Sequence, residues 1–122
     1  MNAVGLDMDI IAAARQVARV AACDEYDEIE DLEDAIAATK ARFLAEAIPQ
    51  VLLALADVRT LEADVEDRAF ATALVGRITR CLHSAATVMA AEAGVPLSQI
   101  GGEYWASQWN DPWVFGPDAP QH

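Results

Sequence analysis

The sequence has few basic residues. Its 122 residues include only 8 Lys and Arg against 20 Asp and Glu, so the formal net charge is −12 at pH 7. No Lys or Arg follows Arg80. Binding to nucleic acid needs cations that neutralise the backbone phosphates, so the composition argues against direct nucleic-acid binding. The charge favours a protein partner with a basic surface.

The sequence also lacks a long uncharged run and a cysteine motif. The uncharged stretch Ala47–Ala56 has ten residues, whereas a membrane-spanning helix needs about twenty. Near the N-terminus, Asp7 and Asp9 stand where a signal peptide would carry Lys or Arg. Cys23 and Cys81 lie far apart and form no metal-ligand spacing. We therefore expect a reduced, cytoplasmic protein without membrane contact, in which both cysteines are packing residues.

Helix-forming residues are abundant. The chain contains 26 alanines and no run of alternating β-branched residues. We predict an all-α fold, a small helical bundle of about four main helical segments with a short aromatic C-terminal helix and an irregular tail. Residues 1–109 form the single domain in this interpretation. Residues 110–122, which contain three prolines and a glycine, form the tail.

Capping and helix-breaking residues predict where the first helical segments begin and end. Asp7 as N-cap starts a helix that runs to about Ala22, and Asp24 caps the second helix. Pro49 lacks an N–H and should kink or break that helix. Residues 51–56 then continue as a third segment.

A long fourth helix restarts at Thr60 or Asp64 and ends at Ala93, before Gly94. Helical spacing predicts its buried seam as Leu74, Ile78, Leu82, Ala85 and Met89. The same spacing predicts the buried stripe of the second helix as Ile29, Leu32, Ile36 and Phe43. The apolar faces are wider than one small bundle needs, so we expect a homodimer.

A cluster of acids lies at the start of the predicted second helix. Residues 24–34 hold eight acids in eleven positions, namely Asp24, Glu25, Asp27, Glu28, Glu30, Asp31, Glu33 and Asp34. Acids at a helix N-terminus interact favourably with the macrodipole, so one interpretation is a solvated, acid-rich helix start. A second is a negative stripe that docks into a basic groove of another protein. A third is a magnesium site.

The segment DEIEDLEDAI (Asp27–Ile36) resembles the first metal-binding helix of the MazG-like all-α nucleotide pyrophosphohydrolases. That family shows an EExxE pattern, followed about twenty residues later by ExxD, and the four carboxylates hold magnesium on the phosphates of a nucleoside triphosphate. Asp27, Glu28 and Asp31 stand at the EExxE positions. The resemblance therefore implies that these acids bind Mg²⁺ beside an activated water.

The continuation EAIPQVLLALADV (Glu46–Val58) resembles the second metal helix of that family. Here the ExxD positions hold Ala47 and Gln50, and Glu46 is a nearby acid. A second register of the comparison places Arg77 where the family has a metal-binding Asp. The metal ligands implied by the resemblance are Asp27, Glu28, Asp31 and Glu46.

The C-terminal region gathers the aromatic side chains. Five of the eight aromatics fall within residues 104–115, namely Tyr104, Trp105, Trp109, Trp113 and Phe115. Trp105 and Trp109 lie four apart and share a helix face. One interpretation is a lid that folds back over the alanine-rich bundle. The other is an anchor for a partner, because Trp and Tyr dominate interface hot spots.

The sequence contains no complete catalytic set, and we predict no catalytic residue and no cofactor. The expected function is that of an acidic helical protein-binding module, an inhibitor or modulator of a nucleic-acid-handling protein. The predicted partner-binding residues are Glu28, Asp31, Asp34, Trp109 and Trp113. The alternative is a divergent MazG-like pyrophosphohydrolase that uses Mg²⁺ to act on nucleoside triphosphates.

Overall fold

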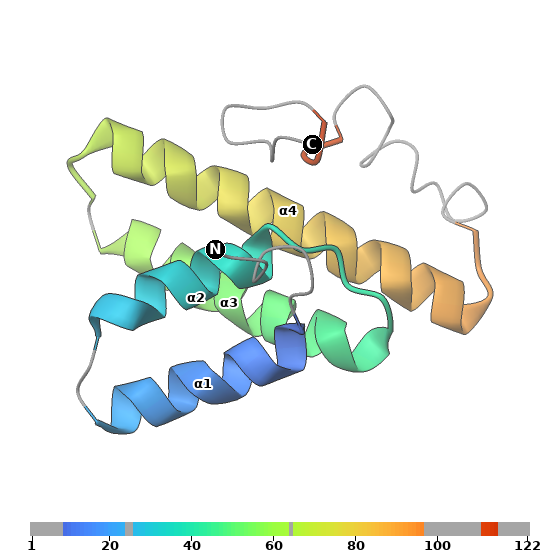
Figure 1. Ribbon diagram of the computed structural model, residues 1–122. Helices are drawn as coiled ribbons and strands as arrows, with labels where there is room; N and C mark the ends of the chain where they lie inside the picture. Colours follow the sequence, from blue (N-terminus) through green and yellow to red (C-terminus); the bar gives the residue numbers. More distant parts are fainter. Residues whose placement is uncertain (1–8, 24–25, 64, 97–110, 115–122) are drawn as a thin grey trace.

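The computed structural model describes residues 9–23, 26–63, 65–96 and 111–114, and over these ranges it contains four α-helices and no strand. The helices are α1 (Ile10–Ala22), α2 (Asp27–Ala37), α3 (Leu44–Glu62) and α4 (Arg68–Ala93). The predicted all-α bundle is therefore confirmed (Figure 1). The predicted aromatic helix at 103–109 lies outside the described residues.

Helices α1 and α2 form an antiparallel pair in Figure 1. Asp9 is the N-cap of α1, and its side chain accepts hydrogen bonds from the backbone N–H groups of Ile11 and Ala12. Since α1 begins at Ile10, the prediction of Asp7 as its cap is wrong. Helix α2 has no side-chain cap at its start, but Asp27, Glu28 and Glu30 lie in its first turn, where negative charge is favourable.

The chain turns between α2 and α3 at residues 38–43, and α3 then runs without a break through Pro49. The predicted break at Pro49 is therefore wrong, and the second helix ends at Ala37 instead. Proline removes one N–H that would have bonded to the carbonyl of Ala45. Ala45 is exposed, so water can satisfy that carbonyl, and the helix continues.

Helix α4 packs antiparallel against α3 (Figure 1). Asp67 caps its N-terminus by accepting hydrogen bonds from the N–H groups of Ala69 and Phe70, so the predicted start at Thr60 or Asp64 is wrong. The predicted end is confirmed, because Gly94 adopts φ +70° directly after Ala93. Glycine enters this left-handed region without a steric penalty.

The core lies where all four helices meet. One buried cluster consists of Ile10, Ala13, Ile36, Ala37, Leu53, Ala54, Ile78 and Cys81. A second, smaller cluster joins α3 and α4 through Ala47, Ala85 and Val88. Within the described ranges, none of the helices combines the length and the apolar character that crossing a bilayer requires.

Two predicted buried stripes differ from the structure. In α4, Leu82 and Met89 are exposed, and the neighbouring Cys81 and Val88 are buried in their place. Phe43 is exposed because it precedes α3 rather than continuing the face of α2. Helix α4 carries a second apolar stripe, and spacing alone did not reveal which stripe faces the core.

The two cysteines are free thiols in different environments. Cys81 is buried, and burial raises the pKa of its thiol to about 12. It is thus a packing residue, as predicted. Cys23 is exposed at the end of α1, so the prediction that it is a packing residue is wrong.

Candidate functional site

Arg77 of α4 lies among four carboxylates that come from two other helices. Its Nε and Nη2 donate hydrogen bonds of 2.8 and 2.6 Å to the two carboxylate oxygens of Asp57 in α3. Nη1 donates to Asp34 Oδ1 at 2.9 Å, and Nη2 to Glu33 Oε1 at 3.4 Å. Glu30 Oε1 lies 3.6 Å from Nη1. We call Glu30, Glu33, Asp34, Asp57 and Arg77 the Arg77 cluster.

Burial and charge act in opposite directions on Arg77. Burial of the guanidinium alone would lower its pKa, but the bonds and charge of Asp57, together with Asp34 and Glu33, raise the pKa above its usual value. Arg77 and Asp57 are both buried. The loss of hydration in such a buried pair can cost as much free energy as the attraction returns, but separating the two side chains would leave each charge buried and unpaired. The cluster therefore fixes α2, α3 and α4 relative to one another.

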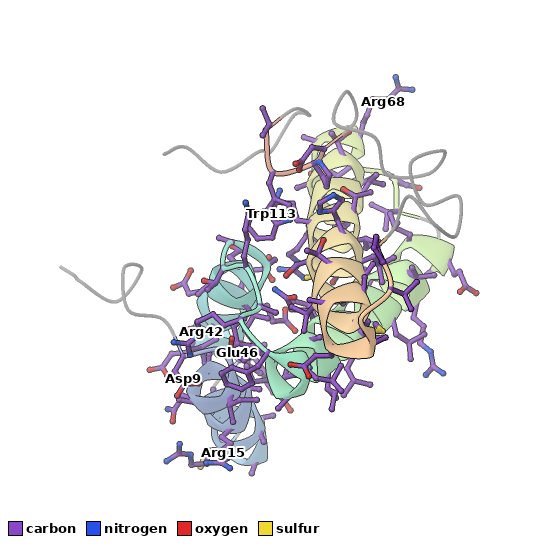
Figure 2. The ribbon with its side chains drawn as sticks, turned by 90° about the vertical axis from the view of Figure 1, so that its right-hand side faces the viewer. Asp9, Arg15, Arg42, Glu46, Arg68 and Trp113 are labelled. Atoms are coloured by element: carbon purple, nitrogen blue, oxygen red, sulfur yellow. The ribbon has the colours of Figure 1, made fainter. Side chains whose placement is uncertain are left out.

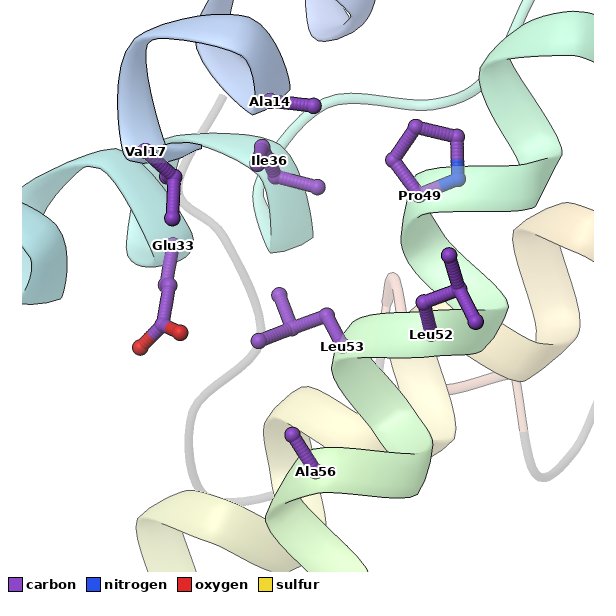
Figure 3. A pocket seen from close by; sticks show the side chains of 8 residues that line it. All are labelled: Ala14, Val17, Glu33, Ile36, Pro49, Leu52, Leu53 and Ala56. Atoms are coloured by element: carbon purple, nitrogen blue, oxygen red, sulfur yellow. The ribbon is translucent and has the colours of Figure 1, made fainter. Parts of the chain in front are cut away.

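The pKa of Glu33 is raised in the Arg77 cluster. Burial raises the pKa of its carboxyl, Arg77 partly counteracts this, and the charges of Asp57, Glu30 and Asp34 raise the pKa further. Glu33 also lines an open pocket of about 300 Å³ between α1, α2 and α3. In Figure 3 it lies on the α2 side of this pocket, opposite Leu53 and Pro49 of α3. Its carboxylate is the one charged group in an otherwise aliphatic lining.

Glu46 forms a second, separate charge pair at the start of α3. The backbone N–H of Arg42 donates to Glu46 Oε1 at 2.7 Å, and the guanidinium donates to both carboxylate oxygens at 3.1 and 2.6 Å. Hydrogen bonding from Arg42 lowers the pKa of Glu46, although burial opposes this. Figure 2 shows the two side chains together near Asp9. Glu46 thus holds the turn before α3.

The positions that carry ExxD in the MazG-like family have structural roles in this chain. Ala47 packs against Ala85 and Val88 of α4. Gln50 is fully buried, and its Nε2 donates hydrogen bonds to the carbonyls of Ile36 and Thr39, at 3.1 and 2.7 Å. These contacts give further hydrogen bonds to carbonyls at the end of α2 and in the turn that follows it, where backbone groups lack the regular helical partners. The second half of the family's ligand pattern is replaced by packing and capping.

The residues implied as magnesium ligands do not fit a metal site. Asp27, Glu28 and Asp31 are exposed on α2, whereas Glu46 is buried and bonded to Arg42. Among the described residues, no group of three or more His, Cys, Asp or Glu side chains is placed to hold a metal ion. Where carboxylates of two facing helices do converge, the cation between them is the guanidinium of Arg77.

The acids predicted to contact a partner form the outward face of α2. Glu28, Asp31 and Asp34 follow one another at intervals of three residues, and all three are exposed. Asp34 also bonds to Arg77, whereas Asp27, Glu28 and Asp31 make no ion pair with any described residue. No Lys or Arg occurs within α2. We call Asp27, Glu28, Asp31 and Asp34 the acidic face.

Trp113, also predicted to contact a partner, is buried. Only 2% of the residue is exposed, and Lys40 Nζ lies 5.6 Å from the centre of the ring, a cation–π distance. His83, Ser84 and Thr87 of α4 line a small pocket together with these two residues. The ring is therefore packed inside the fold and not presented to a partner, which agrees with the lid interpretation for this residue. Trp109 lies outside the described residues.

Sequence reasoning missed the role of Arg77. Its signal was present, since Arg77 falls between Leu74 and Ile78 on the buried side of α4. A charged residue inside an apolar stripe indicates a buried ion pair. Comparisons of the chain with family models, with curated proteins and with solved structures find no match, so the MazG-like resemblance rests on the quoted residues alone.

Proposed function

We propose that this chain is a protein-binding module without catalysis of its own, which docks through the acidic face of α2 onto a basic surface. Among proteins, basic surfaces of this kind occur on those that bind nucleic acid. The chain would then act as an inhibitor or modulator of a nucleic-acid-handling protein, in the cytoplasm. The observation that carries the proposal is that Arg77 pairs with Glu30, Glu33 and Asp34 of α2, whereas the other acids of the acidic face, Asp27, Glu28 and Asp31, pair with no cation among the described residues.

The geometry of the acidic face suits electrostatic docking. Asp27, Asp31 and Asp34 lie on the side of α2 away from the buried Ile36. Over these positions α2 rises about 1.5 Å per residue, so the exposed carboxylates make a dense line of negative charge. Such a line raises the rate of association with a basic partner and selects against acidic ones. The partner itself supplies the missing cations.

The test compares two variants that change the net charge equally. The first, Asp27→Lys/Glu28→Lys/Asp31→Lys, reverses the acidic face but keeps Asp34, which Arg77 needs. The control reverses three exposed acids elsewhere, Glu62→Lys/Glu66→Lys/Glu92→Lys. A partner is retrieved on the immobilised chain at low salt, and its affinity is then measured by calorimetry with each purified variant.

We expect the first variant to lose about tenfold or more in affinity, together with most of its salt dependence. The affinity of the control variant for the partner should stay close to that of the unaltered chain. Equal affinities for both variants, or the absence of any partner, would contradict the proposal. Metal-dependent release of pyrophosphate from a nucleoside triphosphate, lost in Glu28→Gln, would replace it with the pyrophosphohydrolase alternative.

A further inference from the structure

Helix α3 directs its charged residues inward and its large apolar residues outward. Between positions 44 and 58 the charged residues are Glu46 and Asp57, and both are buried. The exposed residues of the same stretch include Leu44, Ile48, Val51, Leu52, Leu55 and Val58. A surface helix of a globular protein normally shows the opposite arrangement. The outward side of α3 therefore has the composition of a helix face that packs against another apolar surface.

The apolar residues on this side of α3 follow the spacing of a helix-pairing seam. Leu44, Ile48, Val51, Leu55 and Val58 alternate between steps of four and three residues. This is the 3.5-residue repeat with which helices pack side by side at a small crossing angle. Within the chain, α4 occupies a different side of α3, the side of Ala47 and Ala54. The seam thus has no partner helix among the described residues.

Helix α4 extends the same surface. Val75, Leu82 and Met89 lie seven residues apart and are exposed. Over positions 69–91 the Lys and Arg residues are Arg77 and Arg80, and both are buried. The outward surface of this stretch is therefore free of formal charge, apart from the partly exposed His83.

The antiparallel packing of α3 and α4 aligns the two sets of residues. Asp57 is bonded to Arg77, and Ala47 packs with Ala85 and Val88. This register sets Met89 level with the start of the α3 seam, Leu82 level with its middle, and Val75 level with its end. In Figure 2, α1 and α2 lie at the left of the view, and α3 and α4 lie at its centre and right.

We define the α3–α4 outer face by nine residues: Leu44, Ile48, Val51, Leu52, Leu55, Val58, Val75, Leu82 and Met89. Between 36% and 58% of each of these residues is exposed. Nine such residues offer an area on the order of the roughly 800 Å² that each partner buries in a standard-sized interface. Exposed apolar patches of this size are rare on monomers and mark interaction sites.

We propose that the α3–α4 outer face is the surface through which two copies of this chain associate about a two-fold axis. Charge decides in favour of a second copy. Two chains that each carry a net charge of −12 repel one another, so contact between them is favoured where neither presents charge. The outer face meets that condition, whereas the acidic face on α2 does not. In a two-fold arrangement the same patch serves both chains, so one self-complementary seam is sufficient.

The inference is independent of the proposed function, and its test is the oligomeric state of the full chain. Sedimentation velocity over a wide range of concentration should give a mass twice that of one chain. The variant Ile48→Glu/Leu55→Glu places two charges at the centre of the face. It should halve the measured mass while keeping the helical circular dichroism of the unaltered protein.

A matched control separates position from charge. Ala12→Glu/Ala18→Glu adds the same two charges at exposed positions of α1 and should remain a dimer. A monomeric unaltered chain at all concentrations would overturn the inference, since another part of the chain or a different protein would then cover the face. A dimeric Ile48→Glu/Leu55→Glu variant would also overturn it.

A second measurement applies if the charged variant fails to fold. Hydroxyl-radical footprinting of the unaltered protein compares a concentrated sample with a dilute one. We expect Leu55, Leu82 and Met89 to become protected on concentration, while exposed Val114 keeps its reactivity. Equal labelling of the outer face in both samples, when the mass shows a dimer, would place the interface elsewhere.

Discussion

At the scale of single residues, Arg77 is held by several partners at once. It is bonded to Asp57, Asp34 and Glu33, and its side chain is almost inaccessible to solvent. Removing one partner of a buried charge pair leaves the other uncompensated, which costs more than the pair itself contributes. Loss of Arg77 alone should therefore lower stability strongly.

We predict that Arg77→Gln lowers the free energy of unfolding by about 3 kcal/mol or more, because Asp57 is left buried without a cation. Arg59→Gln, which removes an exposed arginine from α3, should change it by less than about 0.5 kcal/mol. Urea denaturation followed by circular dichroism measures both. The double variant Asp57→Leu/Arg77→Leu should recover part of the lost free energy of unfolding, because it removes both charges. Equal effects of Arg77→Gln and Arg59→Gln would contradict the assignment of Arg77 to a buried ion pair.

The raised pKa of Glu33 leads to a prediction about how stability depends on pH. Its pKa in the folded protein is raised above its ordinary value of 4.5, so the folded state holds this proton more tightly than the unfolded state does. The contribution to stability is complete below about pH 4.5 and is lost as the pH rises through the folded pKa. We expect Glu33→Gln to be more stable than the unaltered chain at pH 7 and equally stable at pH 4.

The control for this prediction is Asp31→Asn, which removes an exposed acid from the same helix. The pKa of Glu46 is lowered, so its contribution to stability is lost as the pH falls and not as it rises. We therefore compare each variant with the unaltered chain at the same pH, which removes the effect of Glu46 from the difference. Thermal unfolding over the range from pH 4 to pH 7 gives these differences. The same stability difference at both ends of the range would contradict the effect of burial on Glu33.

At the scale of helices, the sequence predicted the fold class and the cap at Gly94, because these depend on local preferences. Alanine content favours helices wherever they pack, and a left-handed residue after a helix favours glycine. The predicted break at Pro49 failed because the chain had already turned at residues 38–43. A proline early in a helix costs one hydrogen bond, and here water can reach the carbonyl that loses it.

The buried seam of α4 was predicted only in part, for a reason that bears on function. Leu74, Ile78 and Ala85 are buried as expected, whereas Leu82 and Met89 are exposed. Periodicity finds apolar stripes but does not reveal what each stripe contacts. One stripe of α4 packs on the core of this chain, and the other is left on the outer face.

The candidate site was also predicted in part. The exposure of Glu28, Asp31 and Asp34 follows from their places on α2, opposite the apolar residues. The position of Arg77 between two buried apolar residues indicated a buried ion pair, but the sequence could not name its partners on α2 and α3, because those contacts join residues 20 and 43 positions apart. Burial of Trp113 depends on its contact with α4, and a contact between residues so far apart in the sequence cannot be predicted from local sequence patterns.

At the scale of the whole molecule, the described residues form two contrasting surfaces, one acidic and one apolar. Asp27, Glu28 and Asp31, which pair with no described cation, lie on the outer side of α2. The outer side of α3 and α4 carries apolar residues between positions 44 and 58 and between 69 and 91. Two proposals follow from this division, docking to a basic partner and association with a second copy. The two contacts should respond in opposite directions to salt.

We predict that raising the salt concentration from about 0.05 to 0.5 M weakens binding to the basic partner and strengthens self-association. Salt screens the attraction between the acidic face and the partner's cations. It equally screens the repulsion between two chains of net charge −12, while the apolar contact between them is not reduced. Calorimetry with the partner and sedimentation of the chain alone measure the two constants in the same buffers. If self-association weakened with salt, charged groups would have to meet across that interface, and the uncharged outer face of α3 and α4 could not be the surface that forms it.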